Sequence, residues 1–387
     1  MRCNILIIGG GIVGSSIAYH LARGGRSGDI IVVERDPTYA LAATPRGNGG
    51  IRQLFSLPEN IAMARYGLSF FREFETEMVV DGDPVPIGFR RQGYLFISDD
   101  GGDRRMEQNF HLQISNGVRA ECLDREGLHD RFPSLRTDDV ALAVHSPDDA
   151  WIDPYAALQG FRRKARDLGV RYVTDEVIDW RGDGRLARQA VLASGETVDA
   201  DVHVLAAGAW STEVGAKIGL TLPVEPMARE THFFRPAVKI ENLPFIKTET
   251  HLAFRPEGDG FAGGLPDWSV PAGWNFDASA DGFETIVWPA VAHRVPALET
   301  LKLERTWVGH YARNTLDLSA IIGPWTGGIE NVYMAVGFSG HGIMHAPAAG
   351  RAVAELILDG GFQTLDLSRF GWSRVPNARP YGEQGII

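Results

Sequence analysis

Three glycines near the start of the sequence, Gly9, Gly11 and Gly14, have the spacing at which a main chain can approach a phosphate group. The apolar run before them has the length of a buried strand, and residues 12–23 after them have the periodicity of a helix. The N-terminus of a helix offers N–H donors and partial positive charge to phosphate oxygens. A second apolar run ends at Glu34, about twenty residues beyond Gly14, where a carboxylate can bind ribose hydroxyls. Together these features predict a strand–helix–strand unit that binds a dinucleotide.

The acid at residue 34 disfavours the 2′-phosphate of NADP, which leaves FAD and NAD as candidate ligands. An NAD-dependent enzyme would normally continue with further strand–helix units of the same sheet. Residues 35–56 instead form a polar loop with Gly47, Gly49 and Gly50, and this loop is too long for a routine connection. Such a loop is expected to lie across a large ligand. The sequence therefore favours FAD, with an NAD-linked dehydrogenase as the alternative.

A second glycine-rich segment, GFSGHGIMHAPAAG, begins at Gly337. It follows the apolar run NVYMAVGF and continues through the loop SGHGIM into a helical run with Pro347 near its start. Glycines suit a backbone that must approach a planar group closely, because a Cβ atom would hold it away. Small residues also follow a buried run in the middle of the chain, at Ala206, Ala207 and Gly208. Nucleotide-binding elements are therefore predicted at the start, the middle and the end of the chain.

The stretches between these elements differ in character. Residues 227–316 hold alternating aromatic segments, which predict an antiparallel sheet that forms the wall of a pocket. Asp153 and Pro154 predict the start of a helix, as its N-cap and its first helical residue. We therefore expect two interleaved domains. The nucleotide-binding domain is expected over residues 1–85, 150–225 and 316–387, and the second domain over residues 86–149 and 226–315.

The composition limits the partners of the protein. The formal net charge of −11 argues against nucleic acid or an anionic membrane surface as the main partner. The two cysteines, Cys3 and Cys122, provide neither a disulfide framework nor the spacing of a zinc site, so no metal is expected. The apolar run at the N-terminus is too short to span a membrane and lacks a convincing signal-peptide cleavage site. We expect a cytoplasmic protein without a membrane span, and the oligomeric state is not predicted.

Five segments that span nearly the whole chain carry a resemblance to a known family. They are GGGIVGSSIAYHLA, GNGGIRQLFS, VLAAGAWS, WVGHYARNTLD and GFSGHGIMHAPAAG. Together they resemble the D-amino-acid-oxidase-like (DAO) family of FAD proteins, near glycine oxidase, sarcosine oxidase and the β subunit of dye-linked proline dehydrogenase. The resemblance implies an α/β fold in which a Rossmann-like FAD-binding domain is interleaved with an α+β substrate-binding domain on an antiparallel sheet. The segment YARNTLD also resembles the branch with a mitochondrial FAD-dependent assembly protein for a respiratory complex.

The resemblance also implies which residues bind FAD. Binding is expected to be noncovalent, because neither Cys3 nor Cys122 lies where relatives attach the cofactor. The implied cofactor-binding residues are Gly9, Gly11, Ile12, Val13, Gly14, Glu34, Arg35, Thr44, Asn48, Gly49, Gly50, Ile51, Val177, Ala206, Ala207, Gly208, Trp210, Gly337, Phe338, Gly340, His341, Gly342, Ile343 and Met344.

Four residues are candidates for the catalytic site. In this family the last loop wraps the flavin ring, so N–H groups of residues 342–344 would stabilise negative charge on reduced flavin. A lysine after the glycine loop of sarcosine oxidases pairs with the substrate carboxylate, and Met344 stands there in this chain. Arg52 is then the candidate that binds the carboxylate, because guanidinium does so bidentately. His341 is expected either to contact the flavin or to cap the turn, and Tyr311 either to line the pocket or to complete a strand.

The implied reaction is hydride transfer from the carbon next to a secondary or D-amine to flavin N5, which gives an imine that hydrolyses. A neutral bound amine needs no strong base, so the protein is expected to contribute orientation and electrostatic field. Relatives that react rapidly with O2 carry a lysine beneath the flavin, and the matching segment here, residues 259–267, has none. The sequence therefore favours an electron acceptor other than O2 for this small amine or amino-acid substrate. The alternative is a non-catalytic assembly role in which FAD is structural.

Overall fold

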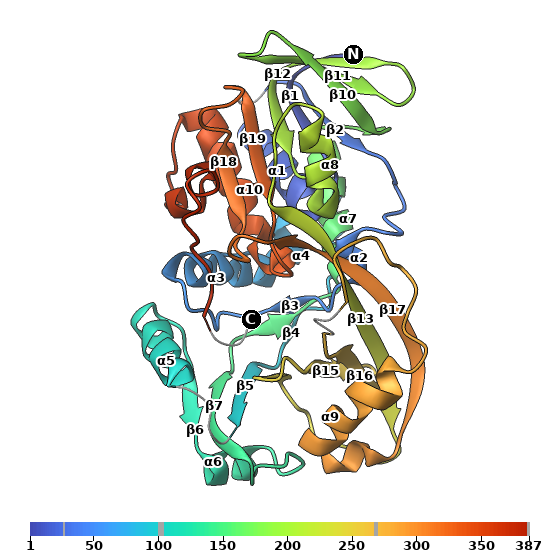
Figure 1. Ribbon diagram of the computed structural model, residues 1–387, viewed down its shortest axis with the longest axis vertical. Coiled ribbons are helices and arrows are strands. Elements are labelled where there is room, and N and C mark those ends of the chain that lie inside the picture. The colour runs from blue at the N-terminus through green and yellow to red at the C-terminus, as the bar shows by residue number, and fades with distance from the viewer. Residues whose placement is uncertain (26–27, 100–103, 267–269, 385–387) are drawn as a thin grey trace.

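The computed structural model describes residues 1–25, 28–99, 104–266 and 270–384. Two large sheets organise this part of the chain, and they lie at opposite ends of the molecule (Figure 1). Strands of the first sheet come from the start, the middle and the end of the sequence, and strands of the second come from the two stretches between. This interleaving agrees with the predicted fold class, while the domain boundaries given above stay a prediction.

The first sheet is mixed and has eight strands. Its parallel part runs β12-β1-β2-β9, β19 pairs with β12 in parallel, and β10, β11 and β18 are antiparallel additions. Most side chains of β1 and β2 are buried, as in strands covered on both faces. The strands are β1 (Arg2–Ile8), β2 (Ile30–Glu34), β9 (Arg171–Thr174), β10 (Val177–Gly182), β11 (Ala187–Leu192), β12 (Thr197–Leu205), β18 (Ile321–Pro324) and β19 (Val332–Val336).

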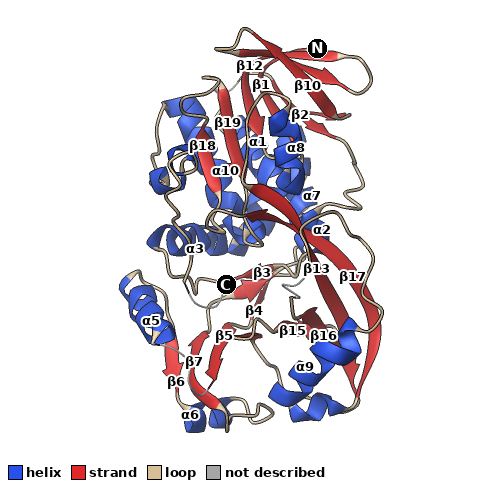
Figure 2. Ribbon diagram, in the orientation of Figure 1, coloured by secondary structure: helices blue, strands red, loops and turns tan. Residues whose placement is uncertain are grey.

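Helices gather around this sheet (Figure 2). Helix α1 packs against α10 and α7, and α10 packs against α3. The close approach of α1 and α10 requires Gly350, because a Cβ atom there would lie 2.2 Å from the Ser16 hydroxyl. As predicted, Asp153 caps α7 by accepting hydrogen bonds from two N–H groups of its first turn, and Pro154 is the first helical residue. The helices are α1 (Ile12–Arg23), α3 (Pro58–Arg72), α4 (Phe74–Glu77), α7 (Pro154–Asp167), α8 (Ser211–Ala216) and α10 (Gly342–Asp359).

The second sheet confirms the antiparallel sheet predicted for residues 227–316. Its order is β17-β13-β16-β15-β14-β5-β7-β6, and only the β14–β5 pair among these is parallel. Strands β13 and β17 pair along their whole length. The strands are β5 (Tyr94–Asp99), β6 (Glu121–Leu123), β7 (Val140–Ser146), β13 (Val224–Pro236), β14 (Phe245–Thr248), β15 (Ala253–Glu257), β16 (Gly260–Gly264) and β17 (Leu301–Asn314).

Shorter elements complete the fold. Helices α5 (Arg105–Ser115), α6 (Arg125–Arg131) and α9 (Trp288–Arg294) accompany the second sheet (Figure 1). A three-stranded sheet of β3 (Gly50–Ile51), β8 (Ala150–Trp151) and β4 (Arg90–Arg91) lies between the two large sheets. Single turns are α2 (Ala43–Arg46), η1 (Gly208–Trp210), η2 (Phe283–Val287), η3 (Pro296–Glu299), η4 (Ser368–Phe370) and η5 (Trp372–Arg374).

Three apolar clusters form the core, one on each face of the first sheet and one on the second sheet. The largest joins β1, α1, α10 and α3, and it holds the elements that carry the glycine motifs in fixed positions. Over the described ranges, no helix has the length and apolar content needed to cross a membrane.

Candidate active site

A cavity of about 600 Å³ lies between the two large sheets. On one side it is lined at the carboxyl ends of parallel strands, by Ile8 of β1, Glu34 of β2 and Ala206 after β12. On the other side it is lined by residues of the antiparallel sheet, among them Arg229 of β13 and Tyr311 of β17. We call these the nucleotide end and the substrate end. The carboxyl ends of parallel strands are where open α/β sheets bind ligands, and the volume suits an organic molecule.

The glycines of the first motif are required by close main-chain contacts. Gly9 has a φ of 98°, and a Cβ atom there would lie 2.5 Å from the carbonyl oxygen of Ala206. A Cβ atom on Gly14 would lie 1.9 Å from the carbonyl oxygen of Gly9, so Gly14 allows α1 to pack against the turn after β1. Gly11, the N-cap of α1, lines the cavity, and a Cβ atom there would meet only the Thr44 hydroxyl, at 3.9 Å. The N-terminus of α1 therefore leaves room for a phosphate group.

Glu34 lines the cavity at the end of β2. Its carboxylate accepts hydrogen bonds from the N–H groups of Gly10 at 2.8 Å and Asp36 at 3.0 Å. Burial raises the pKa of this carboxyl, and the two N–H groups oppose that shift. The next residue, Arg35, places its guanidinium 4.0 Å from the ring centroid of Trp210, and both line the cavity. Glu34 is thus held where the motif requires an acid, and its contact with a ribose stays a prediction.

The late loop, residues 337–344, lines the cavity from Phe338 onward, and one detail of its prediction is wrong. The sequence predicts loop as far as Met344, but α10 begins at Gly342, so residues 342–344 form its first turn. These residues face the cavity at a helix N-terminus, where main-chain N–H groups and the helix dipole favour negative charge. Gly340 has a φ of 97°, and a Cβ atom there would lie 2.6 Å from the ring of Tyr311.

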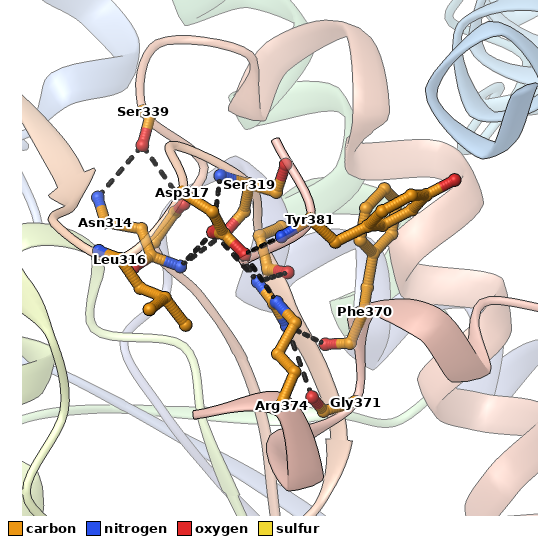
Figure 3. A network of polar contacts seen from close by, with 11 residues as sticks. Asn314, Leu316, Asp317, Ser319, Ser339, Phe370, Gly371, Arg374 and Tyr381 are labelled. Atoms are coloured by element: carbon orange, nitrogen blue, oxygen red, sulfur yellow. Dashed lines mark hydrogen bonds and ion pairs between the residues drawn. The ribbon is translucent and has the colours of Figure 1, made fainter. Parts of the chain in front are cut away.

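A polar network supports the late loop from behind (Figure 3). The N–H of Asn314, at the end of β17, donates to the hydroxyl of Ser339, and the Asn314 amide donates to the carboxylate of Asp317. Arg374 forms an ion pair with Asp317, with 2.7 Å between Nε and Oδ2, and these side chains are 6% and 0% exposed. The N–H of Tyr381 donates to the same carboxylate. The C-terminal segment is thereby fixed to the base of the late loop.

Arg52 lines the cavity in the loop that follows β3, and its side chain is 2% exposed. Its guanidinium donates a hydrogen bond to the carbonyl oxygen of Leu54, and its Nη2 lies 3.2 Å from Nε2 of His341. It also lies 4.0 Å from the ring centroid of Phe55. Burial, followed by the charges of Arg52 and other basic groups, lowers the pKa of His341 well below its usual value. His341 is therefore neutral and can accept a hydrogen bond from Arg52.

The structure brings the candidate catalytic residues together. Arg52, Tyr311, His341 and Met344 all line the cavity. Tyr311 comes from β17 of the antiparallel sheet, Arg52 from the loop after β3, and His341 and Met344 from the N-cap and the first turn of α10. Most predicted cofactor-binding residues line it as well. Gly14, Ile51 and Gly337 do not, because Gly14 packs against Gly9, Ile51 is in the core, and Gly337 packs against Val224 and Asn314.

Two basic residues of the substrate end were missed by sequence reasoning. Arg229 of β13 and Lys247 of β14 line the cavity, as do the aromatic residues Tyr94 and Phe245, whose rings stack with centroids 4.4 Å apart. A signal existed in the order Phe245, Ile246, Lys247, because residues two apart in a strand share a face. That signal is short and could not indicate which partner strands the face would meet.

Lys247 also bears on the expectation about O2. Residues 259–267 contain no lysine, as noted, but β14 supplies one to the same cavity. Burial, followed by the charges of Arg52 and Arg229, lowers the pKa of Lys247 well below its usual value. The preference for an electron acceptor other than O2 therefore stays a prediction.

The residues that line the cavity fit FAD. Gly11 and Gly208 face it without side chains, and a Cβ atom on Gly208 would meet nothing within 4 Å. This leaves main chain exposed at the nucleotide end, while the helix N-termini at Gly11 and His341 favour anionic groups at two separate places. A long ligand with phosphates at one end and a ring that gains negative charge at the other matches this arrangement.

Comparison with known proteins agrees with this assignment. The FAD-dependent oxidoreductase domain-containing protein 1 of Xenopus laevis is 37% identical to this chain, over 100% of the chain and 85% of the relative. Rat mitochondrial dimethylglycine dehydrogenase is 28% identical, over 100% of the chain and 48% of the relative. The structure of L-proline dehydrogenase from P. horikoshii superposes with a TM-score of 0.88 and 26% identity, covering 98% of this chain and 99% of that one.

A more distant structure, glycine oxidase from Geobacillus kaustophilus, superposes with a TM-score of 0.82 at 21% identity, covering 96% of this chain and 99% of that one. It bears on the fold alone. The family described as DAO, FAD dependent oxidoreductase, matches residues 4–356. The combination of a parallel Rossmann-like sheet, an antiparallel sheet and a cavity between them is therefore explained by descent, and the chain belongs to the DAO family of FAD-dependent oxidoreductases.

Proposed function

We propose that the protein oxidises a carboxylated secondary or D-amine, by removing hydride from the carbon next to nitrogen and giving an imine that hydrolyses to amine and carbonyl products. The observation that carries this proposal is Arg52, a buried guanidinium that lines the cavity beside His341 of the late loop. A buried arginine at this place suits a substrate carboxylate, which it can bind through two parallel hydrogen bonds. Relatives named for oxidising N-methylated or cyclic amino acids, dimethylglycine dehydrogenase and L-proline dehydrogenase, act on carboxylated amines, and proline is a secondary one.

Bound FAD would supply the acceptor of the hydride. The chain would hold its phosphates at Gly11 and the N-terminus of α1, and its ribose hydroxyls at Glu34. The first turn of α10 would stabilise negative charge that develops on the ring, through main-chain N–H groups of residues 342–344. Neither Cys3 nor Cys122 lines the cavity, which supports noncovalent binding.

The substrate end can favour the reactive form of the amine without a general base. Hydride departs from a neutral amine, and a bound ammonium group would be repelled by Arg52 and Arg229. These positive charges lower the pKa of any amine bound near them, so its proton passes to solvent before the reaction. The aromatic side chains of Tyr94, Phe245 and Phe338 line the cavity and limit access of water to the reacting carbon.

The test is anaerobic reduction of the purified yellow protein by a panel of N-methyl, cyclic and D-amino acids. Loss of the oxidised flavin absorbance with one class, and no change with the same amines lacking a carboxylate, is the expected result. If no carboxylated amine reduces the flavin, the proposed function is wrong, and a structural role of FAD gains support. Admission of air then distinguishes O2 from another acceptor by the rate at which absorbance returns. A cytoplasmic location stays a prediction from the composition.

A further inference from the structure

The substrate end of the cavity concentrates basic side chains. Arg52, Arg229 and Lys247 line it from three different elements, the loop after β3, strand β13 and strand β14. Arg229 stands opposite Gly309 in the β13–β17 pair, and its guanidinium lies 5.1 Å from the ring centroid of Tyr311. Lys247 stands between Phe96 of β5 and Ala253 of β15 in the same sheet. Strand pairing thus fixes the positions of Arg229 and Lys247 in the sheet.

Arg52, Arg229 and Lys247 are near enough for the charge of one to shift the pKa of another. Burial is the largest cause of the lowered pKa of Lys247, and the charges of Arg52 and Arg229 follow it. Arg229 has a lowered pKa chiefly because of burial, and Lys247 and Arg229 together contribute to the lowered pKa of the neighbouring His251. Like charges held together in a partly desolvated site repel one another, and an anion that binds between them removes that repulsion.

The acidic residues that the structure describes along the cavity lie mostly at its nucleotide end. Among the lining residues that the structure describes, most acids are at the ends of β2 and β9, at the nucleotide end. Glu230 is the exception, in β13 beside Arg229. Its carboxylate accepts hydrogen bonds from the N–H of Ser279 at 2.6 Å and from the Ser279 hydroxyl at 3.0 Å. Among the described residues, the charged side chains that line the substrate end are therefore mostly basic.

We propose that the substrate is an amine with two carboxylates, one bound by Arg52 and the other by Arg229 and Lys247. This inference rests on the proposed function and narrows its substrate class to amino dicarboxylic acids and to amines with two carboxyalkyl arms. The reacting carbon then lies between two fixed points, because both ends of the substrate are held by side chains from a rigid sheet and a buried loop. Two-point binding orients the C–H bond more narrowly than one carboxylate contact could.

The experiment measures binding without turnover. The holoenzyme is titrated with acids that have no amine, glutarate and succinate against butyrate and propionate, and the shift of the flavin absorbance gives each Kd. We expect each dicarboxylate to bind at least roughly 30-fold more tightly than the monocarboxylate that lacks its second carboxyl group, since it gains one charged contact. Arg229→Gln and Lys247→Met should each reduce this ratio to below about 5-fold, and should leave the affinity for monocarboxylates nearly unchanged.

Matched controls come from the same sheet. Arg235→Gln in β13 and Lys302→Met in β17 remove exposed cations whose ion pairs with Asp259 and Glu304 lie outside the cavity. Both controls should keep the wild-type preference. If the variants at Arg229 and Lys247 keep it too, or if the wild type binds the two kinds of acid equally, the inference is wrong. If a variant fails to retain FAD, the comparison of dicarboxylate with monocarboxylate binding by the wild type tests the inference alone.

The outcome is separable from that of the proposed function. Dicarboxylates that bind tightly while no carboxylated amine reduces the flavin would refute amine oxidation and keep the dianion site. If monocarboxylic amines reduce the flavin as readily as dicarboxylic ones, and dicarboxylates bind no more tightly than monocarboxylates, amine oxidation is supported and the dianion site is refuted.

Discussion

At the nucleotide end of the cavity, Gly9, Gly11 and Gly208 bring main chain to the surface, and helix N-termini supply the polar groups. At the substrate end, by contrast, Arg229 and Lys247 supply charge through long side chains that project from paired strands. The nucleotide end depends on main-chain segments that pack too closely to leave room for a Cβ atom. The substrate end depends on which side chains the strand pairing brings to one place.

This difference determines how each end tolerates change. A main-chain site fails when the backbone is displaced, because every N–H donor moves with it. A side-chain site loses one contact at a time, so its variants should change affinity or specificity while FAD stays bound. Substitutions at the two ends should therefore differ in kind as well as in size.

The largest effect is expected for Gly14→Val, which tests the main-chain end. A Cβ atom on Gly14 would lie 1.9 Å from the carbonyl oxygen of Gly9, so α1 must move away from the turn that would hold the phosphates. We expect the protein to lose FAD altogether, as measured by the ratio of flavin to protein after gel filtration. In Gly361→Val the nearest atom to a Cβ would be the Gln363 amide at 4.0 Å, and FAD content should stay at the wild-type level. Full retention of FAD by Gly14→Val would contradict the assignment of this end.

The late loop is expected to be an exception to this comparison, because it contributes main chain to the site but side chains packed against it hold its shape. Arg374→Met would leave the fully buried carboxylate of Asp317 without its ion-pair partner (Figure 3). Removing one member of a buried pair costs about 3–5 kcal/mol of unfolding free energy. Urea denaturation of the holoenzyme would measure it. The exposed pair of Arg188 and Asp183 is the control, and Arg188→Met should cost far less, because a solvent-exposed ion pair contributes little to stability. Similar losses in the two variants would show that the network does not stabilise the fold.

Arg52→Lys should have a smaller effect, restricted to the substrate end. A lysine has no second donor in the geometry of a guanidinium, so it cannot bind a carboxylate bidentately. We expect affinity for monocarboxylates and dicarboxylates alike to fall roughly 100-fold, or about 2.7 kcal/mol, with FAD retained. The flavin absorbance titration measures it, and Arg72→Lys at the exposed end of α3 is the control. A loss for dicarboxylates alone would place Arg52 with the second carboxylate instead.

The two ends also differ in how far the sequence could predict them. Gly9, Gly11 and Gly14 lie close together in sequence and in space, so their spacing predicted the strand–helix turn, whereas the family was indicated only by five segments taken together. Arg52 was found through its place beside a family motif. Arg229 and Lys247 come from strands whose pairing joins distant segments, and nothing local shows that they meet. The start of α10 at Gly342 was missed for another reason, because glycine is a poor helix former and was interpreted as loop.

The smallest effect concerns pH and isolates Lys247. Burial and the charges of Arg52 and Arg229 lower its pKa in the free holoenzyme, and a bound dicarboxylate would raise that pKa again. The complex then holds more protons than the free protein, so affinity for glutarate should fall as pH rises, by up to about tenfold per unit. The other groups around Lys247 should not titrate with it between about pH 6 and pH 9. His251 and His341 have lowered pKa values, the pKa of Tyr94 is raised, and the two arginines stay charged.

This prediction separates Lys247 from the general positive field of the substrate end. Lys247→Met should abolish the pH dependence of glutarate binding, whereas Lys302→Met, exposed on β17, should retain it. Butyrate should show a weaker dependence than glutarate in the proteins that keep Lys247, because its single carboxylate offsets the charge of Arg52 only. If the affinity of Lys247→Met for glutarate still falls as pH rises, another group titrates, and Arg229 is the only partner of the second carboxylate. A slope that disappears would show that the sheet contributes a cation whose charge appears when the substrate binds.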